Sequence, residues 1–228
     1  MSAALDGPRI AATGKARALV VFLHGYGADG NDLIEIGRQW RQLLPDVAFV
    51  SPNAPDRAPG APMGRQWFAL SNRPADDKAG ADERWNGAVK ARAAIDAFLD
   101  AELSQLGLDD SRLALVGFSQ GTMMALHVGL RRRRAPGAIL GYSGLLVGPE
   151  RLNEATARDA KGAPPPILLI HGDQDPLIPV DALFIAFEAL AGAEIPAQWH
   201  VSYGVGHGID AGGLRHGGLF LAQALARR

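Results

Sequence analysis

Ser119 lies in the pattern Gly-x-Ser-x-Gly, because residues 117–121 read Gly-Phe-Ser-Gln-Gly. An apolar run at 113–116 reads as a strand, and residues 122–126 continue as a helix without proline. A serine on a sharp turn between a strand and a helix exposes its hydroxyl, and the helix amino end favours developing negative charge. Glycines suit such a turn because side chains there would crowd the backbone. The pattern therefore predicts a nucleophile at Ser119.

A serine hydroxyl is a poor nucleophile until a base takes its proton. His207 is the favoured base among the 6 histidines, because it lies in a glycine-rich loop directly after the last predicted strand. That position is the carboxyl end of the sheet, where ligands bind in α/β folds. His127 falls inside a predicted helix and His200 inside a predicted strand, so both are interpreted as structural, and His216 as a surface residue.

The histidine also needs a carboxylate that fixes its tautomer and stabilises the imidazolium. Asp173 and Asp175 both follow the predicted strand that ends near Ile170. Asp175 precedes Pro176, which holds it in an extended loop conformation. We therefore predict Asp175 as the acid, and we expect Asp173 to brace the loop through backbone hydrogen bonds.

Acyl transfer needs N–H donors aimed at the oxyanion that forms in the transition state. The residue after the nucleophile, Gln120, supplies one backbone N–H. The second is expected in the loop after an early strand, where residues 23–27 read Leu-His-Gly-Tyr-Gly, and the N–H of Tyr26 is the candidate. His24 in the same loop is interpreted as a brace, because a single base is sufficient.

The elements that must position these residues alternate between short apolar runs and longer helical stretches. This alternation predicts an α/β fold with a mostly parallel central sheet flanked by helices. The expected strands are 18–23, 47–51, 112–116, 138–142, 166–170 and 197–203, with one or two antiparallel edge strands before residue 17. The expected helices are 31–44, 83–106, 120–132, 180–190 and 217–226.

Residues 53–82 interrupt this alternation, because they are rich in Pro, Gly, Ala and charge and show neither period. A loop of this length in a compact domain is typically functional or disordered. Its centre carries an apolar patch that includes Trp67 and Phe68. We interpret the segment as a loop insertion over a binding cleft, with a partly disordered insertion as the alternative.

Composition limits the function classes. The chain has 228 residues, 47% hydrophobic and 21% charged, which predicts one globular domain over 1–228. The formal net charge of −1 gives no reason to expect nucleic acid or an anionic membrane as a partner. The chain has no cysteine, so disulfides and thiolate chemistry are excluded. No metal-ligand constellation or phosphate-binding loop is apparent, so neither a metal nor another cofactor is expected.

Location is inferred from the same sequence. Residues 1–15 lack a basic start followed by an apolar stretch, so no secretion signal is expected. The longest apolar runs are far too short to span a bilayer, which argues against stable membrane insertion. The expected location is the cytoplasm. A homodimer is compatible with the sequence, but no residue argues for it.

Taken together, these motifs resemble the phospholipase/carboxylesterase family of α/β-hydrolases, which includes acyl-protein thioesterases and small bacterial carboxylesterases. The blocks that carry the resemblance are residues 23–30, Trp67-Phe68, 117–121, and 172–176 followed by Gly206-His207. They run over most of the chain in the family's order. The order of serine, acid and histidine also matches that of α/β-hydrolases.

The resemblance implies the α/β-hydrolase fold and specific roles for residues. Ser119, Asp175 and His207 would form the catalytic triad, with Tyr26 and Gln120 as oxyanion donors. Trp67 and Phe68 would line the acyl or alcohol side of the cleft. Two positions depart from the family's usual residues and bear on substrate size: Tyr26 stands where an aliphatic residue is common, and Val205 where Met is common.

The resulting hypothesis is a serine carboxylesterase that hydrolyses short- to medium-chain esters of small molecules through an acyl-enzyme on Ser119. The alternative is an acyl-protein thioesterase or lysophospholipase, which would need a long apolar groove. A more remote alternative is a non-catalytic binding protein with the same fold, although such proteins usually lack a triad residue and this chain has all three.

Overall fold

The structure, a computed structural model, describes residues 5–71, 77–155 and 157–226. Within these ranges, seven strands form one sheet in the order β1-β3-β2-β6-β7-β8-β9, and the sheet is parallel except for β1, which pairs antiparallel with β3. The strands are β1 (Arg9–Ile10), β2 (Ala18–Leu23), β3 (Val47–Val50), β6 (Leu113–Phe118), β7 (Ala138–Tyr142), β8 (Ile167–Gly172) and β9 (Ala197–Ser202). The predicted mostly parallel sheet is confirmed.

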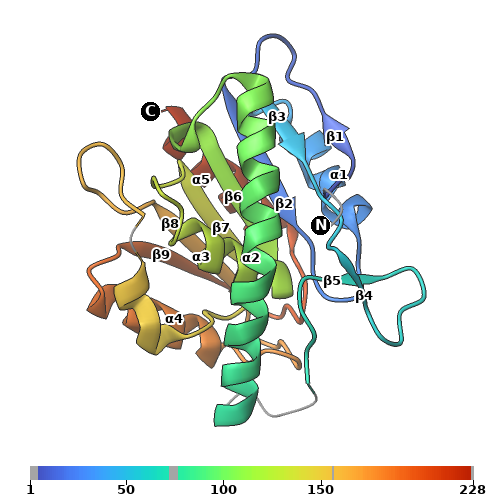
Figure 1. Cartoon of the computed structure of the whole chain (residues 1–228), viewed down its shortest axis with the longest axis vertical. Helices are drawn as coiled ribbons and strands as arrows, with labels where there is room; N and C mark the ends of the chain where they lie inside the picture. Colours follow the sequence, from blue (N-terminus) through green and yellow to red (C-terminus); the bar gives the residue numbers. More distant parts are fainter. Residues whose placement is uncertain (1–4, 72–76, 156, 227–228) are drawn as a thin grey trace.

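Helices cover both faces of the sheet (Figure 1). Helices α2 (Lys78–Leu106), α3 (Gln120–Gly129) and α4 (Asp181–Gly192) pack on one face, and α1 (Gly30–Trp40) and α5 (Ala211–Ala226) on the other. Successive side chains of a strand point to opposite faces, so a strand between two helix layers must be apolar throughout. In β2, for example, Leu19 and Val21 enter one core, whereas Val20 and Phe22 enter the other.

The segment predicted as a long loop, 53–82, contains more regular structure than expected. A short antiparallel hairpin, β4 (Asp56–Arg57) with β5 (Arg65–Gln66), lies within it. Each arm has two residues, which is too short for an alternating pattern to be visible in the sequence. Helix α2 begins at Lys78, because the Asp77 side chain accepts the Gly80 N–H at 3.2 Å. Residues 72–76 of this segment lie outside the described residues.

Other element bounds differ from the prediction for local reasons. Helix α5 begins at Ala211, six residues before the expected start at 217, within a glycine-rich stretch. The carboxylate of Asp210 accepts the N–H groups of Gly212 and Gly213 at 3.0 and 3.1 Å, which stabilises a first turn that propensity disfavours. Two short 3₁₀ helices, Asp110–Arg112 and Pro149–Glu154, were not predicted. In the described parts of the chain, none of the helices has the length and apolar character that a membrane crossing requires.

Candidate active site

Ser119 occupies the turn between β6 and α3 in a strained conformation, with φ 53° and ψ −117°. Its N–H donates to the carbonyl of Tyr142 at 2.9 Å, which attaches the turn to the neighbouring strand β7. The two flanking glycines are required by close packing: a Cβ on Gly117 would lie 2.4 Å from Gly121, and one on Gly121 would lie 1.7 Å from the Leu23 carbonyl oxygen. The strand–turn–helix context predicted from the sequence is therefore present.

Asp175 and His207 are joined by a hydrogen bond of 2.7 Å between Oδ2 and the ring Nδ1. The Asp175 side chain has no exposed surface, and its Oδ1 accepts the N–H groups of Leu177 and Ile178, both at 2.9 Å. Burial alone would raise the pKa of Asp175, but the N–H of Ile178, the His207 ring and the N–H of Leu177 together lower it below its ordinary value. The carboxylate is therefore ionised at neutral pH and able to stabilise a charged imidazole.

The imidazole of His207 lies beside the strand that leads to the serine. Its ring centroid is 5.0 Å from that of Phe118, the residue before Ser119. The His207 side chain is 16% exposed, so it faces the protein on one side and is accessible on the other. The structure thus brings Ser119, Asp175 and His207 to the edge of the sheet where β6, β8 and β9 end.

Several side chains hold the loop that carries His207. Asp173 accepts the N–H of Gly204 at 2.6 Å, which is the kind of brace expected for this residue. Ser143 donates from its hydroxyl to the carbonyl of Gly208 at 3.1 Å, and its own φ is 45°. The role of Ser143 was not found in the sequence, because nothing local to residue 143 indicates that β7 ends beside the His207 loop.

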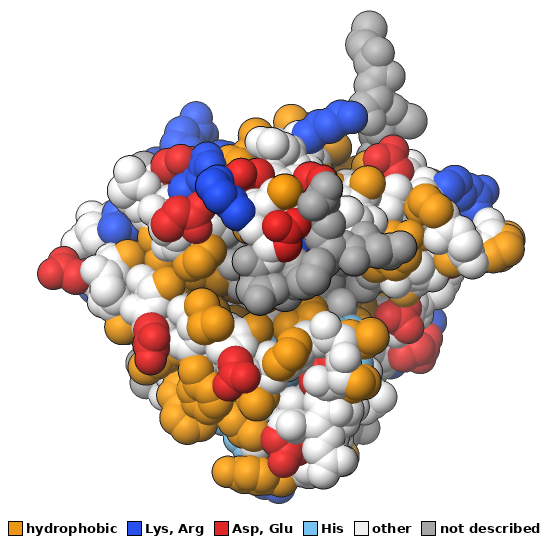
Figure 2. All heavy atoms as spheres, turned by 90° about the horizontal axis from the view of Figure 1, so that it is seen from below, with side chains coloured by type: hydrophobic (Ala, Val, Ile, Leu, Met, Phe, Trp, Pro, Cys, Tyr) orange, Lys and Arg blue, Asp and Glu red, His pale blue; other side chains and the backbone are white. Residues whose placement is uncertain are grey.

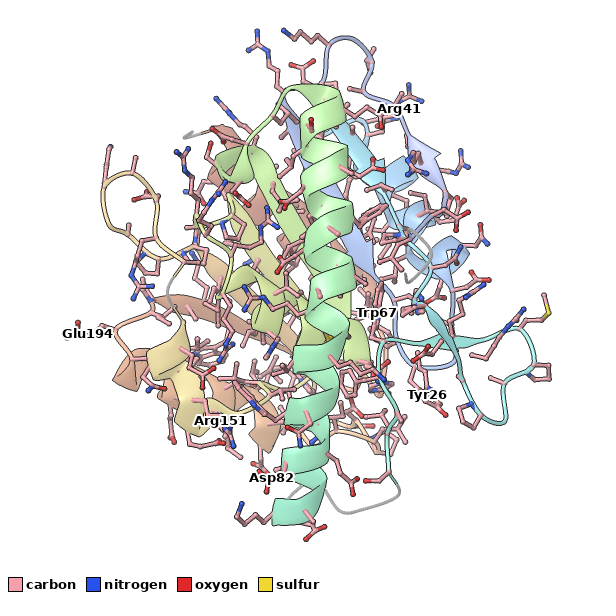
Figure 3. All side chains as sticks on the ribbon, in the orientation of Figure 1. Tyr26, Arg41, Trp67, Asp82, Arg151 and Glu194 are labelled. Carbon is pink, nitrogen blue, oxygen red and sulfur yellow. The ribbon has the colours of Figure 1, made fainter. Side chains whose placement is uncertain are left out.

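The loop that carries Tyr26 packs against the nucleophile. A Cβ on Gly25 would lie 3.4 Å from the Cβ of Ser119. His24 is fully buried, and its Nε2 accepts the N–H of Ala54 at 3.0 Å, so the ring proton is on Nδ1 and donates to the Gly25 carbonyl at 2.8 Å. Burial lowers the pKa of His24, which keeps the ring neutral in this bracing role. The Tyr26 hydroxyl donates to the carbonyl of Pro59 at 3.1 Å, towards the β4–β5 hairpin (Figure 3).

Trp67 and Phe68 are almost fully buried, with only 2% and 4% of their surface exposed. The indole N–H of Trp67 donates to the carbonyl of His24 at 2.9 Å, so this residue supports the loop that carries Tyr26 (Figure 3). Both residues also border a groove of about 1070 Å³ between residues 67–71 and α2. The residues that line this groove do not include Ser119, Asp175 or His207.

Comparison with known proteins places the chain in a family. The family model described as Phospholipase/Carboxylesterase matches residues 7–224. The crystal structure of esterase PE8 is 44% identical, with a TM-score of 0.90 over 98% of this chain and 100% of that chain. Acyl-protein thioesterase 1 of Gibberella zeae is 28% identical over 196 residues, which are 83% of either chain. Esterase YpfH of Escherichia coli is 28% identical over 203 residues, which are 86% of this chain and 78% of that one.

The matched region contains all the residues discussed above, from the Tyr26 loop to His207. The relatives are named both esterases and thioesterases, and the sheet and its helices are those of α/β-hydrolases. This chain belongs to the phospholipase/carboxylesterase family of α/β-hydrolases and is a hydrolase that acts on ester bonds.

Proposed function

We propose that the protein is a serine carboxylesterase that hydrolyses short- to medium-chain carboxylic esters through an acyl-enzyme on Ser119. The observation that carries the proposal is the 2.7 Å hydrogen bond between Asp175 and His207, formed beside the strand that ends at Ser119. A buried, ionised carboxylate on Nδ1 leaves Nε2 of the imidazole free to exchange protons with the serine.

The proposed reaction has two steps. In the first, Oγ of Ser119 attacks the ester carbonyl carbon, its proton passes to Nε2 of His207, and the alcohol leaves with that proton as the carbon–oxygen bond breaks. In the second, water gives a proton to Nε2 and attacks the acyl carbon, and Ser119 takes the proton back as the acid leaves. The N–H groups of Tyr26 and Gln120 would each stabilise the oxyanion by roughly 3 kcal/mol.

Two features of the surface support a small, uncharged ester as the substrate. Figure 2 views the end of the molecule where the parallel strands end, and hydrophobic side chains occupy much of this face with acidic ones among them. Leu177, in the loop that carries the predicted acid Asp175, is 71% exposed. A face of this kind favours apolar, neutral groups over anions. Trp67 and Phe68 are proposed to line the acyl or alcohol side of the cleft. They would do so from below the loop that carries Tyr26, which Trp67 supports through its hydrogen bond to His24.

The decisive experiment replaces the nucleophile. Ser119→Ala should abolish hydrolysis of p-nitrophenyl acetate and p-nitrophenyl butyrate while leaving the circular dichroism spectrum unchanged. The loss should be on the order of 10⁶-fold in kcat, because a triad acts as a unit. Hydrolysis by this variant at the parent's rate would show that another residue is the nucleophile.

An acyl-protein thioesterase is the second candidate, and several relatives of similar length carry that name. The groove of about 1070 Å³ beside α2 has an alanine-rich lining of the kind that an acyl chain could occupy. The esterase proposal is preferred because the groove does not include Ser119 among its lining residues. Esters and thioesters from C2 to C16 distinguish the two: activity that rises steadily from C12 to C16 would favour the thioesterase or a lysophospholipase.

Active-site labelling tests the alternative that the protein binds a ligand without catalysing a reaction. A fluorophosphonate probe should modify Ser119 of the folded protein, and failure to label would favour the non-catalytic alternative. The proposed reaction requires a small-molecule ester and no metal, cofactor or nucleic acid. The cytoplasm is the proposed location, as expected from the sequence.

A further inference from the structure

His171, near the end of β8, is a buried histidine that the proposed reaction does not use. Its side chain is 1% exposed. Its Nε2 lies 2.8 Å from the carbonyl oxygen of Ile178 and 3.3 Å from Oδ2 of Asp175. Both oxygens are acceptors, because a carbonyl cannot donate and Asp175 is ionised. The proton of the His171 ring is therefore on Nε2 and is donated to the carbonyl of Ile178.

The contacts of His171 connect it to the proposed acid, Asp175. Ile178 accepts from His171 through its carbonyl and donates through its N–H to Oδ1 of Asp175 at 2.9 Å. Asp175 accepts three N–H groups, those of Leu177 and Ile178 on Oδ1 and that of His207 on Oδ2, and Nε2 of His171 lies 3.3 Å from the same Oδ2. His171 is therefore linked to the carboxylate through Ile178, which it holds by a hydrogen bond.

His171 lies on a different structural element from the N–H donors that bind Asp175. Leu177 and Ile178 belong to the same loop as Asp175, and His207 is the group that the carboxylate must hold. His171 belongs to a strand that is paired on both sides, with His171 itself opposite Val201 of β9. A donor on a rigid strand can fix the orientation of a group on a loop, whereas donors within the loop move with it.

We propose that His171 is a positioning residue: its Nε2–H fixes the turn at Ile178, and the N–H of Ile178 holds the carboxylate of Asp175 so that Oδ2 faces His207. The inference rests on the proposed function, because it requires Asp175 to be the acid of the triad. Without the His171 donor, the turn at Ile178 is held less firmly, and the carboxylate of Asp175 is less well fixed against His207. The imidazolium that forms during each proton transfer then loses part of its stabilisation.

Two substitutions distinguish the effect of the His171 N–H from the effect of the volume that its ring fills. His171→Leu removes the N–H, whereas His171→Gln keeps an N–H near the position of Nε2. With rates normalised by fluorophosphonate titration of active sites, His171→Leu should lower kcat for p-nitrophenyl butyrate by roughly tenfold or more with little change in KM. The acid limb of its kcat/KM profile should move to lower pH, since a less stabilised imidazolium loses its proton more readily. His171→Gln should restore both.

The matched control is His127→Leu, which removes another buried histidine, one whose ring packs against Trp85 of α2. It should lower stability but leave kcat per active site and the acid limb unchanged. If His171→Leu behaves like His127→Leu, His171 has only a structural role and the inference is wrong. Asp175→Asn tests the proposed function separately: a rate equal to the parent's would remove Asp175 as the acid, whereas an inactive Asp175→Asn with a normal His171→Leu would overturn only the positioning role.

A measurement on the unmodified protein covers the case in which His171→Leu does not fold. In ¹⁵N-histidine-labelled protein, the Nε2–H resonance of His171, assigned by its loss in His171→Gln, should shift as His207 gains its proton, because Nε2 of His171 lies 3.3 Å from Oδ2, the oxygen that binds His207. A His171 resonance that does not move during that titration, or a proton found on Nδ1, would overturn the inference.

Discussion

The side chain of Gln120 lies against the backbone of Trp67, with Oε1 accepting the Trp67 N–H at 2.9 Å. The amide nitrogen of Gln120 donates in turn to the carbonyl of Phe68 at 2.7 Å, and Gln120 has no exposed surface. The residue after the nucleophile therefore holds the segment that supports the Tyr26 loop. This gives Gln120 a structural role in addition to the one proposed for its backbone N–H.

Gln120→Met should destabilise the protein more than it slows the reaction. The substitution keeps the volume but leaves the Trp67 N–H and the Phe68 carbonyl buried without partners, at a cost of about 2 to 4 kcal/mol in the free energy of unfolding. The backbone N–H at 120 remains, so kcat per active site should fall only slightly. Urea unfolding and titrated kinetics measure the two effects. A large loss of kcat at unchanged stability would contradict this role.

The strain at Ser119 is testable by comparing Ser119→Gly with Ser119→Ala. Both variants lack the hydroxyl and should be inactive. Glycine tolerates a φ of 53° better than alanine, so the glycine variant should be more stable by about 1 kcal/mol in urea unfolding. The matched comparison is Ser104→Gly with Ser104→Ala, inside α2. Here the alanine variant should be the more stable one by about 1 kcal/mol, because glycine is disfavoured in a helix interior. If alanine were the more stable substitution at both positions, the turn at Ser119 would not be strained.

The choice between the two aspartates is tested by a matched pair. Asp175→Asn should lower kcat by roughly 10⁴-fold at neutral pH, because an amide cannot stabilise the imidazolium of His207 and can favour its wrong tautomer. Asp173→Asn keeps an oxygen for the N–H of Gly204, so only a small loss is expected. Steady-state kinetics on the two variants decide the assignment. A larger loss at 173 than at 175 would reverse it.

His127 should make stability depend on pH. Burial, together with the cations of Arg131 and Arg92, lowers the pKa of His127 from 6.5 to about 3. Because the folded value lies below the unfolded one, the stabilisation is present above about pH 6.5 and is lost as the pH falls towards 3. Between pH 7.5 and 5 the free energy of unfolding should fall by roughly 2 kcal/mol from this group.

His127→Phe isolates that contribution. A phenyl ring can keep the contact with Trp85, whose ring centroid is 5.1 Å from that of His127, but it does not titrate. The difference in unfolding free energy between pH 7.5 and 5 should therefore be smaller by roughly 2 kcal/mol in the variant than in the parent. Urea unfolding at the two pH values provides the measurement. An unchanged difference would mean that the folded protein protonates His127 as readily as the unfolded chain does, so that the pKa of His127 is not lowered by folding.

The sequence by itself determined the sheet and the turn that carries Ser119. Runs such as Ala18–Leu23 are apolar at every position, and a strand with that pattern must be covered on both faces, which predicts a parallel sheet between helices. The glycines around Ser119 and the proline after Asp175 constrain the backbone within one or two residues. Such constraints can be read locally, so the candidate residues could be named without coordinates.

Only the tertiary structure decided which other side chains contact the candidate site residues. Trp67 lies in the interior under the Tyr26 loop, where its backbone N–H donates to Gln120 and its indole N–H to His24, and both partners are far away in the chain. The same holds for His171: its ring meets Asp175 only because the loop after β8 folds back over the strand end. Burial and hydrogen-bond partners arise from contacts between distant segments, and no local pattern of residue types encodes the distance at which two side chains finally meet.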